Sequence, residues 1–273
     1  MTTTPRVAPQ IDGPRATSLT TAIASEWTKL WSVRSTWWSL VGGLLLMLLL
    51  ALSMGFDAAQ PPVDATREEA MLAVQDAAAL GIVLAQFALV ALATITVTSE
   101  FATGSMLATL QWEPRRGRVL AAKLAVIAPV VLVSATTMML LAATVADLTA
   151  GDYGSFVLSD VLETAVRTGI YVTLAAVLSA GIGVILRSTA GTLTVVFLVL
   201  MLLPMMLAPL NVPVVSTIGQ YLPGSGGMHF ASSSQMIGLG DLPYSEPTGL
   251  LILLAWTVAV VGAGHLTLAR RDI

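Results

Sequence analysis

Charged residues of both signs gather in one short stretch of this 273-residue chain, from Glu100 to Lys123. The stretch begins with a carboxylate and continues into a basic run that contains Arg115, Arg116 and Arg118. These residues form no catalytic motif, so the chemistry they offer is ion pairing. Their partner is either a carboxylate of the same chain or anionic lipid at a membrane surface.

This charged stretch contains a glycine and a proline, which both disfavour a continuous helix. Gly104 weakens a helix and permits a bend, and Pro114 ends or kinks one. We therefore expect a short amphipathic helix along a membrane surface, followed by a sharp turn into the next apolar segment. The apolar residues of this run are Phe101, Met106, Leu107 and Leu110.

Other residues give no sign of catalysis or metal binding. His229 and His265 are too far apart to form a helical i,i+4 zinc pair, and Glu68-Glu69 has no histidine nearby. The phosphate-binding pattern G-x-x-x-x-G-K-[ST] is absent from the sequence, as are cysteines. We expect a protein that is not itself an enzyme, with no metal site, no cofactor of its own and no nucleic-acid partner.

Six apolar segments make up much of the chain, which is 56% hydrophobic and only 11% charged. Each has about 20 apolar residues or more, enough at about 1.5 Å per residue to cross a hydrocarbon core of about 30 Å. Lipid leaves backbone polar groups without partners, so each segment must be helical. The predicted spans are residues 37–56, 77–97, 119–146, 164–186, 190–210 and 248–268. We predict one all-α integral membrane domain at 19–273, after a disordered cytoplasmic tail at 1–18.

The basic residues predict the orientation of these spans. With six spans, every Lys and Arg except Arg67 and Arg167 falls on one side of the membrane. Short basic loops stay cytoplasmic, so we expect a multi-pass protein of the cell membrane with both termini in the cytoplasm. The residues on that side are Arg6, Arg15, Lys29, Arg34, Arg115, Arg116, Arg118, Lys123, Arg187, Arg270 and Arg271.

A further helix is expected at residues 19–35, just before the first span. Its apolar side chains share one arc, which is typical of an amphipathic helix resting in the membrane interface with its tryptophans at headgroup level. Glu26 projects into that apolar arc, where a charge is tolerable only with a partner. Two partners stay open, Lys29 within the helix and the arginines of 115–118. The charged and aromatic residues of interest are Glu26, Trp27, Lys29, Trp31 and Arg34.

The segments on the other side of the membrane carry weaker signals. Glu163 precedes Arg167 by four residues, which predicts an ion pair on one helix face. Two prolines predict a kink near the outer end of the fifth span. The long loop at 211–247 carries little charge and is expected to fold back onto the spans. We expect short helices near 66–76, 215–221 and 228–238.

The order and spacing of these elements resemble a known family. Over nearly its whole length the chain resembles the permease subunits of type-2 ABC transporters, the ABC-2 group. It shares an interfacial helix, six spans and a long outer loop before the last span. The segment Ser25 to Trp38 is similar to the opening of small actinobacterial members. The group's signature after span 2 is resembled by Glu100-Phe101-x-Thr103-Gly104-Ser105, then Leu110, Pro114, Arg115-Arg116-x-Arg118-Val119-Leu120 and Lys123. Gly104-Ser105 is a departure, because the group more often has Gly-Thr there.

This resemblance implies a role for each region. Residues 100–112 would be a coupling helix that docks into a separate ATP-binding subunit, which would carry the ATP and Mg²⁺. Residues 19–35 would be a connecting helix, and two permease chains would pair with spans 2 and 5 lining a shared pathway. The implied coupling residues are Glu100, Phe101, Thr103, Gly104, Leu107, Leu110, Pro114, Arg115, Arg116 and Arg118. The implied pathway candidates are Phe87, Thr94, Phe197, Met201 and Met205.

The sequence therefore favours the membrane subunit of an ATP-driven exporter for a hydrophobic or amphiphilic substrate, such as a drug, a lipid or a peptide-like molecule. The alternative is a membrane scaffold or sensor that binds an ATPase without moving cargo. An ion-coupled carrier is disfavoured because no span carries an unpaired charge at mid-depth. We also expect Glu26 or Glu100 to pair with Arg115, Arg116 or Arg118, so that motion of the ATPase reaches the spans.

Overall fold

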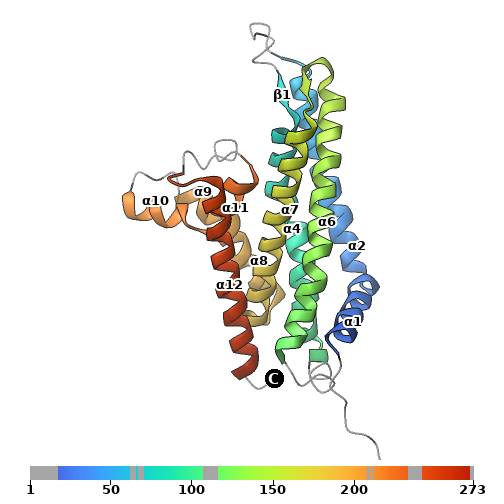
Figure 1. Ribbon diagram of the computed structural model, residues 1–273, viewed down its shortest axis with the longest axis vertical. Coiled ribbons are helices and arrows are strands. Elements are labelled where there is room, and N and C mark those ends of the chain that lie inside the picture. Colours follow the sequence, from blue (N-terminus) through green and yellow to red (C-terminus); the bar gives the residue numbers. More distant parts are fainter. Residues whose placement is uncertain are drawn as a thin grey trace, which may run out of the picture.

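The computed structural model describes residues 18–61, 66, 71–106, 116–207, 210, 212–232 and 242–270, with the side chain of Arg116 left out. Most described residues lie in helices, and the long ones stand side by side (Figure 1). The long apolar elements are α2 (Arg34–Ala58), α4 (Val74–Ala102), α6 (Arg116–Ala150), α7 (Leu158–Leu186), the run α8 (Thr189–Phe197), η2 (Leu198–Leu202) and α9 (Leu203–Leu207), and α12 (Glu246–Arg270). The shorter elements are α1 (Leu19–Ser32), β1 (Leu72–Ala73), η1 (Gly151–Tyr153), β2 (Gly154–Ser155), α10 (Pro213–Gln220) and α11 (Pro223–Ala231).

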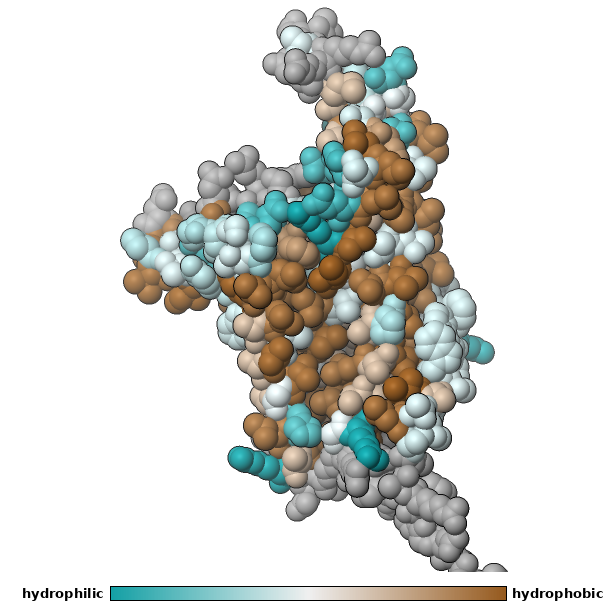
Figure 2. Space-filling view, viewed as in Figure 1, coloured by the Kyte–Doolittle hydropathy of each residue, from teal (hydrophilic) through white to brown (hydrophobic). Residues whose placement is uncertain are grey.

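The prediction of six apolar helices is confirmed. Six helices in the described chain are long and apolar enough to cross a membrane, which is the fold of a multi-pass membrane protein. Figure 2 shows hydrophobic residues along the length of the spans and hydrophilic residues gathered at the lower edge and in the region of α11. We call the lower end of the bundle in Figure 1 the α1 end and the opposite end the β1 end.

Small side chains allow the four central helices, α2, α4, α6 and α7, to pack closely. Buried alanines recur along α4, α6 and α7, and glycines admit neighbouring helices. At Gly55 of α2, for example, an added Cβ would lie 1.8 Å from Thr149 Oγ1 of α6. Because lipid gives no hydrophobic drive to helix association, this close packing supplies the van der Waals contact that holds the bundle together.

The helices that follow α7 in the sequence pack on the α4–α7 side of the bundle, whereas α1 packs against α6 and α2. α12 lies along α7, and α11 packs against both α12 and α7. α11 is buried along most of its length, and its glycines touch neighbouring backbone and rings. An added Cβ at Gly227 would lie 2.4 Å from the ring of Tyr171, and one at Gly226 would lie 2.7 Å from Gly249 O. α10 and α11 thus fold the long loop back onto the spans, as expected.

In the fifth span, where a kink was predicted, a π-helical turn at η2 precedes Pro204, and such turns are one cause of helix kinks. Two other local expectations need correction. In the segment expected to be helical at 66–76, Leu72 and Ala73 form β1, which pairs in parallel with Gly154 and Ser155 of β2, and the helix begins only at Val74 as part of α4. The helix expected at 19–35 ends at Ser32, because Val33 is extended and Arg34 already begins α2. The short helices expected in the loop are found as α10 and α11, the second beginning five residues earlier because Pro223 suits a first turn.

Candidate functional site

The α1 end is built around a sharp corner between α1 and α2. Ser18 caps α1 by accepting a hydrogen bond from the Thr21 amide. At the other end of α1, Thr36 Oγ1 donates to Leu30 O at 2.6 Å and closes the corner. Leu30 then packs with Val126 and other apolar residues of α4 and α6. α1 is therefore held against the bundle along one side, while Trp27 on another side stays exposed.

Four charged side chains meet beneath α1, and we call them the lysine–glutamate cluster: Glu26 and Lys29 of α1, Glu100 of α4 and Lys123 of α6. Lys123 Nζ lies 2.7 Å from Glu26 Oε2 and 2.7 Å from Glu100 Oε1. Lys29 Nζ lies 2.7 Å from Glu26 Oε1 and 3.0 Å from Glu100 Oε1. Each lysine thus bridges both carboxylates, and the cluster joins three helices that are far apart in the sequence.

Burial makes this cluster unusual among charged groups. The side chains of Lys123, Glu26 and Glu100 are 2%, 4% and 10% exposed, whereas that of Lys29 is 43% exposed. Burial alone would lower the pKa of Lys29, but hydrogen bonds and attraction from Glu26 and Glu100 outweigh it, so the pKa is raised. Lys29 therefore stays charged at neutral pH. The two positive charges of the cluster are matched by two negative charges, and such pairing is what allows charged side chains to be buried away from water.

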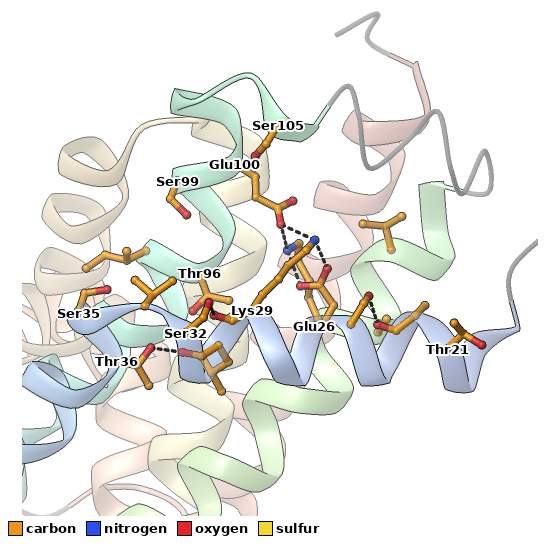
Figure 3. A pocket seen from close by; sticks show the side chains of 18 residues that line it. Thr21, Glu26, Lys29, Ser32, Ser35, Thr36, Thr96, Ser99, Glu100 and Ser105 are labelled. Atoms are coloured by element: carbon orange, nitrogen blue, oxygen red, sulfur yellow. Dashed lines mark hydrogen bonds and ion pairs between the residues drawn. The ribbon is translucent and has the colours of Figure 1, made fainter.

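A cavity of about 610 Å³ adjoins the cluster between α1, α2, α4 and α6. Figure 3 shows Glu26, Lys29 and Glu100 pointing toward one another along the wall of the cavity. The hydrogen bond from Thr36 to Leu30 O lies at the α1–α2 corner, to the left of these three side chains in the same view. The wall of the cavity is mostly apolar, with several residues that carry hydroxyl groups, among them Ser35, Thr96 and Ser99. The arrangement suits ion pairing and polar binding. It offers no catalytic constellation, and the described residues hold no group of His, Cys, Asp or Glu that could bind a metal ion.

The expected coupling residues are partly brought together here. Glu100 and Phe101 form the last turn of α4, Thr103 is its C-cap, and Gly104 bends the chain with φ 71°. Phe101 lies under the guanidinium of Arg187, 5.4 Å from Cζ to ring centroid, which ties the end of α4 to the α7–α8 turn. Leu107, Leu110, Pro114 and Arg115 lie outside the described residues, as does the second half of the expected coupling helix, residues 107–112.

The cations of the cluster are lysines, where we had expected arginines. Lys29 was one of the two partners open for Glu26, and it makes that contact. Lys123 was named as the end of the charged stretch and as part of the family signature, but not as a partner of Glu26 or Glu100. Its burial could have been read from its register, since Val119, Val126 and Val130 share its helix face and are all buried. The side chain of Arg116 is not described, and Arg118 is half-buried at the start of α6.

The interfacial-helix residues divide between two environments. Glu26 is buried and Trp31 is half-buried, whereas Trp27 is exposed and Arg34 lies exposed at the start of α2. The rings of Trp27 and Trp31 are 5.7 Å apart, and those of Trp31 and Trp37 are 5.2 Å apart. A row of three tryptophans therefore runs along the α1–α2 corner, as an aromatic belt at a membrane interface would.

The five pathway candidates do not form one surface. Phe87 of α4 and Phe197 of α8 pack with ring centroids 5.3 Å apart. Phe197 and Met205 are exposed and Met201 is half-buried, so these residues face out of the chain. Thr94 is fully buried within the bundle. Thr96 donates a hydrogen bond to the backbone carbonyl of Leu92, and Thr98 donates one to that of Thr94. Threonine hydroxyls in membrane helices commonly bond to the preceding turn in this way.

A second charged group lies where α12 begins, and we call it the cap cluster: Glu163, Arg167 and Glu246. The predicted pair of Glu163 and Arg167 is confirmed at 2.5 Å. Arg167 also contacts Glu246 of α12 and lies 5.8 Å from the ring of Phe230 in α11. These side chains are 32% to 60% exposed, far more than the buried members of the lysine–glutamate cluster.

No family model matches this chain, and no curated protein matches it either. Its function is therefore inferred from the geometry of the α1 end and from the chemistry of the residues there.

Proposed function

We propose that this chain is the membrane-spanning permease subunit of an ATP-driven exporter for a hydrophobic or amphiphilic substrate. ATP would be hydrolysed by a separate ATP-binding-cassette subunit at the α1 end, and a second copy of the permease would complete the pathway. The observation that carries the proposal is the lysine–glutamate cluster. It joins α1 and the last turn of α4, the two segments on which a partner ATPase would act, to the long helix α6.

Mechanical linkage is the reason why this cluster supports the proposal. A force on α1 or on the α4 end moves Glu26 or Glu100, and each carboxylate is held by the buried Nζ of Lys123. Separating one partner would leave an unpaired ion in a site of low dielectric, which is strongly unfavourable. The three helix ends should therefore move together. The contact of Phe101 with Arg187 extends the same linkage to the fourth and fifth spans.

The chain's own composition favours an energy source outside it. The sequence has no phosphate-binding loop, and the charges near mid-span that ion-coupled carriers use are missing from it. The exposed faces of α8, α9 and α12 carry large apolar residues that lipid or a second permease chain would cover. We place the α1 end in the cytoplasm, because short basic loops are retained there.

Co-expression with candidate ATP-binding-cassette proteins, followed by purification and vesicle assays, tests the proposal. We expect one such protein to co-purify and inside-out vesicles to take up fluorescent hydrophobic dyes or labelled phospholipids only with ATP. ATPase binding without movement of any probe would instead support the scaffold. Movement that survives vanadate or ATP depletion would support a carrier. Absence of any ATPase partner would overturn both ATPase-linked functions.

A further inference from the structure

One oxygen of the Glu100 carboxylate has no hydrogen-bond partner among the residues that the structure describes. Glu100 Oε1 accepts from both lysines of the cluster, but Oε2 is buried and has no hydrogen-bond partner within the described residues. The side chain is 90% buried and lines the cavity next to the cluster. An unsatisfied carboxylate oxygen is among the costliest buried atoms a protein can carry, so a donor from a bound molecule is expected there.

The charged groups beside the cavity differ in burial. Glu100 Oε2 is a buried acceptor, whereas the side chain of Lys29 is 43% exposed and uses two of its three Nζ hydrogens within the cluster. A complementary ligand therefore has a cation with N–H donors that points inward and an anion that faces Lys29. The hydroxyl of Ser99, in the same wall, can accept a further hydrogen bond from the inward cation.

The position of the cavity indicates a lipid as the source of such a ligand. Two exposed residues at the corner of α1 and α2, Ser32 and Val33, line it, so it opens where the first span begins. Leu30 and Ile95 add apolar walls beside the hydroxyls. At about 610 Å³ the cavity lies within the range of small-molecule sites and accommodates a headgroup with its glycerol.

We propose that this cavity binds the phosphoethanolamine headgroup of a membrane lipid. The primary ammonium donates to Glu100 Oε2, the phosphate accepts from Lys29 Nζ, and the acyl chains leave past the α1–α2 corner along the tryptophan row. Such a lipid would complete the lysine–glutamate cluster and bind α1 to the bundle. This inference needs the chain to lie in a membrane, but it does not need the proposed ATPase partner.

The matched lipid for testing this site is phosphatidylcholine. Its headgroup carries the same charges, but its trimethylammonium has no N–H to donate to Glu100 Oε2. The purified chain, stripped of lipid in detergent, is mixed with equal amounts of phosphatidylethanolamine, phosphatidylcholine and phosphatidylglycerol with identical acyl chains. Native mass spectrometry then counts the retained lipids. We expect phosphatidylethanolamine to be retained about tenfold over phosphatidylcholine, as one charge-assisted hydrogen bond allows.

Variants separate this cavity from general lipid binding. Glu100→Gln should remove most of the preference for phosphatidylethanolamine. Ile95→Phe, which fills the cavity without touching a charge, should remove it as well. Glu163→Gln, a carboxylate of the cap cluster, should leave it unchanged. Equal retention of phosphatidylethanolamine and phosphatidylcholine by the unmodified chain overturns the proposal, as does preferential retention of phosphatidylglycerol. No nucleotide or second protein is present, so this failure would leave the proposed export function standing.

Discussion

The two charged clusters of this protein use the same residue chemistry in opposite ways. At the α1 end, four charges are drawn from α1, α4 and α6, and Lys123 is only 2% exposed. In the cap cluster, Arg167 is 32% exposed and its two glutamates are 60% and 46% exposed. Exposed ion pairs contribute little to stability because water competes for both partners, whereas buried pairs must stay intact. The charges at the α1 end must therefore stay paired. The region around α11, which we call the cap, needs a source of stability other than its ion pairs.

Close backbone packing is what holds the cap. α11 places Gly226 against Gly249 O and Gly227 against the Tyr171 ring, with no room for a side chain. Tyr171 OH in turn donates to the buried Gln86 of α4. Tyr244 OH donates to Gln220 O, and burial together with the neighbouring Tyr221 raises its pKa, so this donor stays protonated at neutral pH. The cap is thus held by close backbone contacts and uncharged hydrogen bonds, and the charged residues of the cap cluster lie at its edge.

The largest expected effect comes from removing one buried charge. Lys123→Met leaves two buried carboxylates, Glu26 and Glu100, with only the half-exposed Lys29 to pair them, which should lower the free energy of unfolding by about 3–5 kcal/mol. SDS titration of the purified protein measures the loss. Glu26→Met combined with Lys123→Met removes one charge of each sign and should restore much of the stability. A single variant as stable as the unmodified protein would show that Lys123 is not a charged member of the cluster.

The next effect in size tests packing at the cap. Gly227→Ala adds a methyl group where 2.4 Å separates it from the Tyr171 ring, so the variant should lose about 1–3 kcal/mol of stability by overpacking. Gly262→Ala is the matched control, because an added Cβ at this α12 glycine meets nothing within 4 Å. Equal thermal midpoints for the two variants would contradict a packed cap.

A smaller effect is expected from the charges of the cap cluster. Arg167→Met keeps an aliphatic stem of similar length but removes both ion pairs and the guanidinium that lies over the Phe230 ring, and we expect a loss of no more than about 1 kcal/mol. SDS titration beside Lys123→Met makes the contrast direct. If Arg167→Met were as damaging as Lys123→Met, exposure would not explain the difference between the clusters.

How far the sequence predicted this structure depends on how local each signal was. The spans were found within a few residues, because lipid requires about 20 consecutive apolar residues and an internally bonded backbone. Glu26 was identified as a charge in need of a partner because it breaks the apolar arc of α1. Its second partner could not be read from the sequence, because Lys123 reaches Glu26 only after α6 packs beneath α1. The cap glycines gave no periodic signal, since their role depends on which backbone approaches them.

The smallest expected effect concerns salt, and it sharpens the comparison without changing the buried cluster. Ions screen charges that water reaches over a Debye length of about 10 Å at 0.1 M salt and about 3 Å at 1 M. The stability difference between Arg167→Met and the unmodified protein should therefore shrink by a few tenths of a kcal/mol when salt rises from 0.1 M to 1 M. The difference for Lys123→Met should stay the same, because solvent ions do not reach Lys123 at 2% exposure. Parallel salt dependence in both variants would mean that water enters the lysine–glutamate cluster, and the linkage between α1 and the spans would then be weaker than its geometry implies.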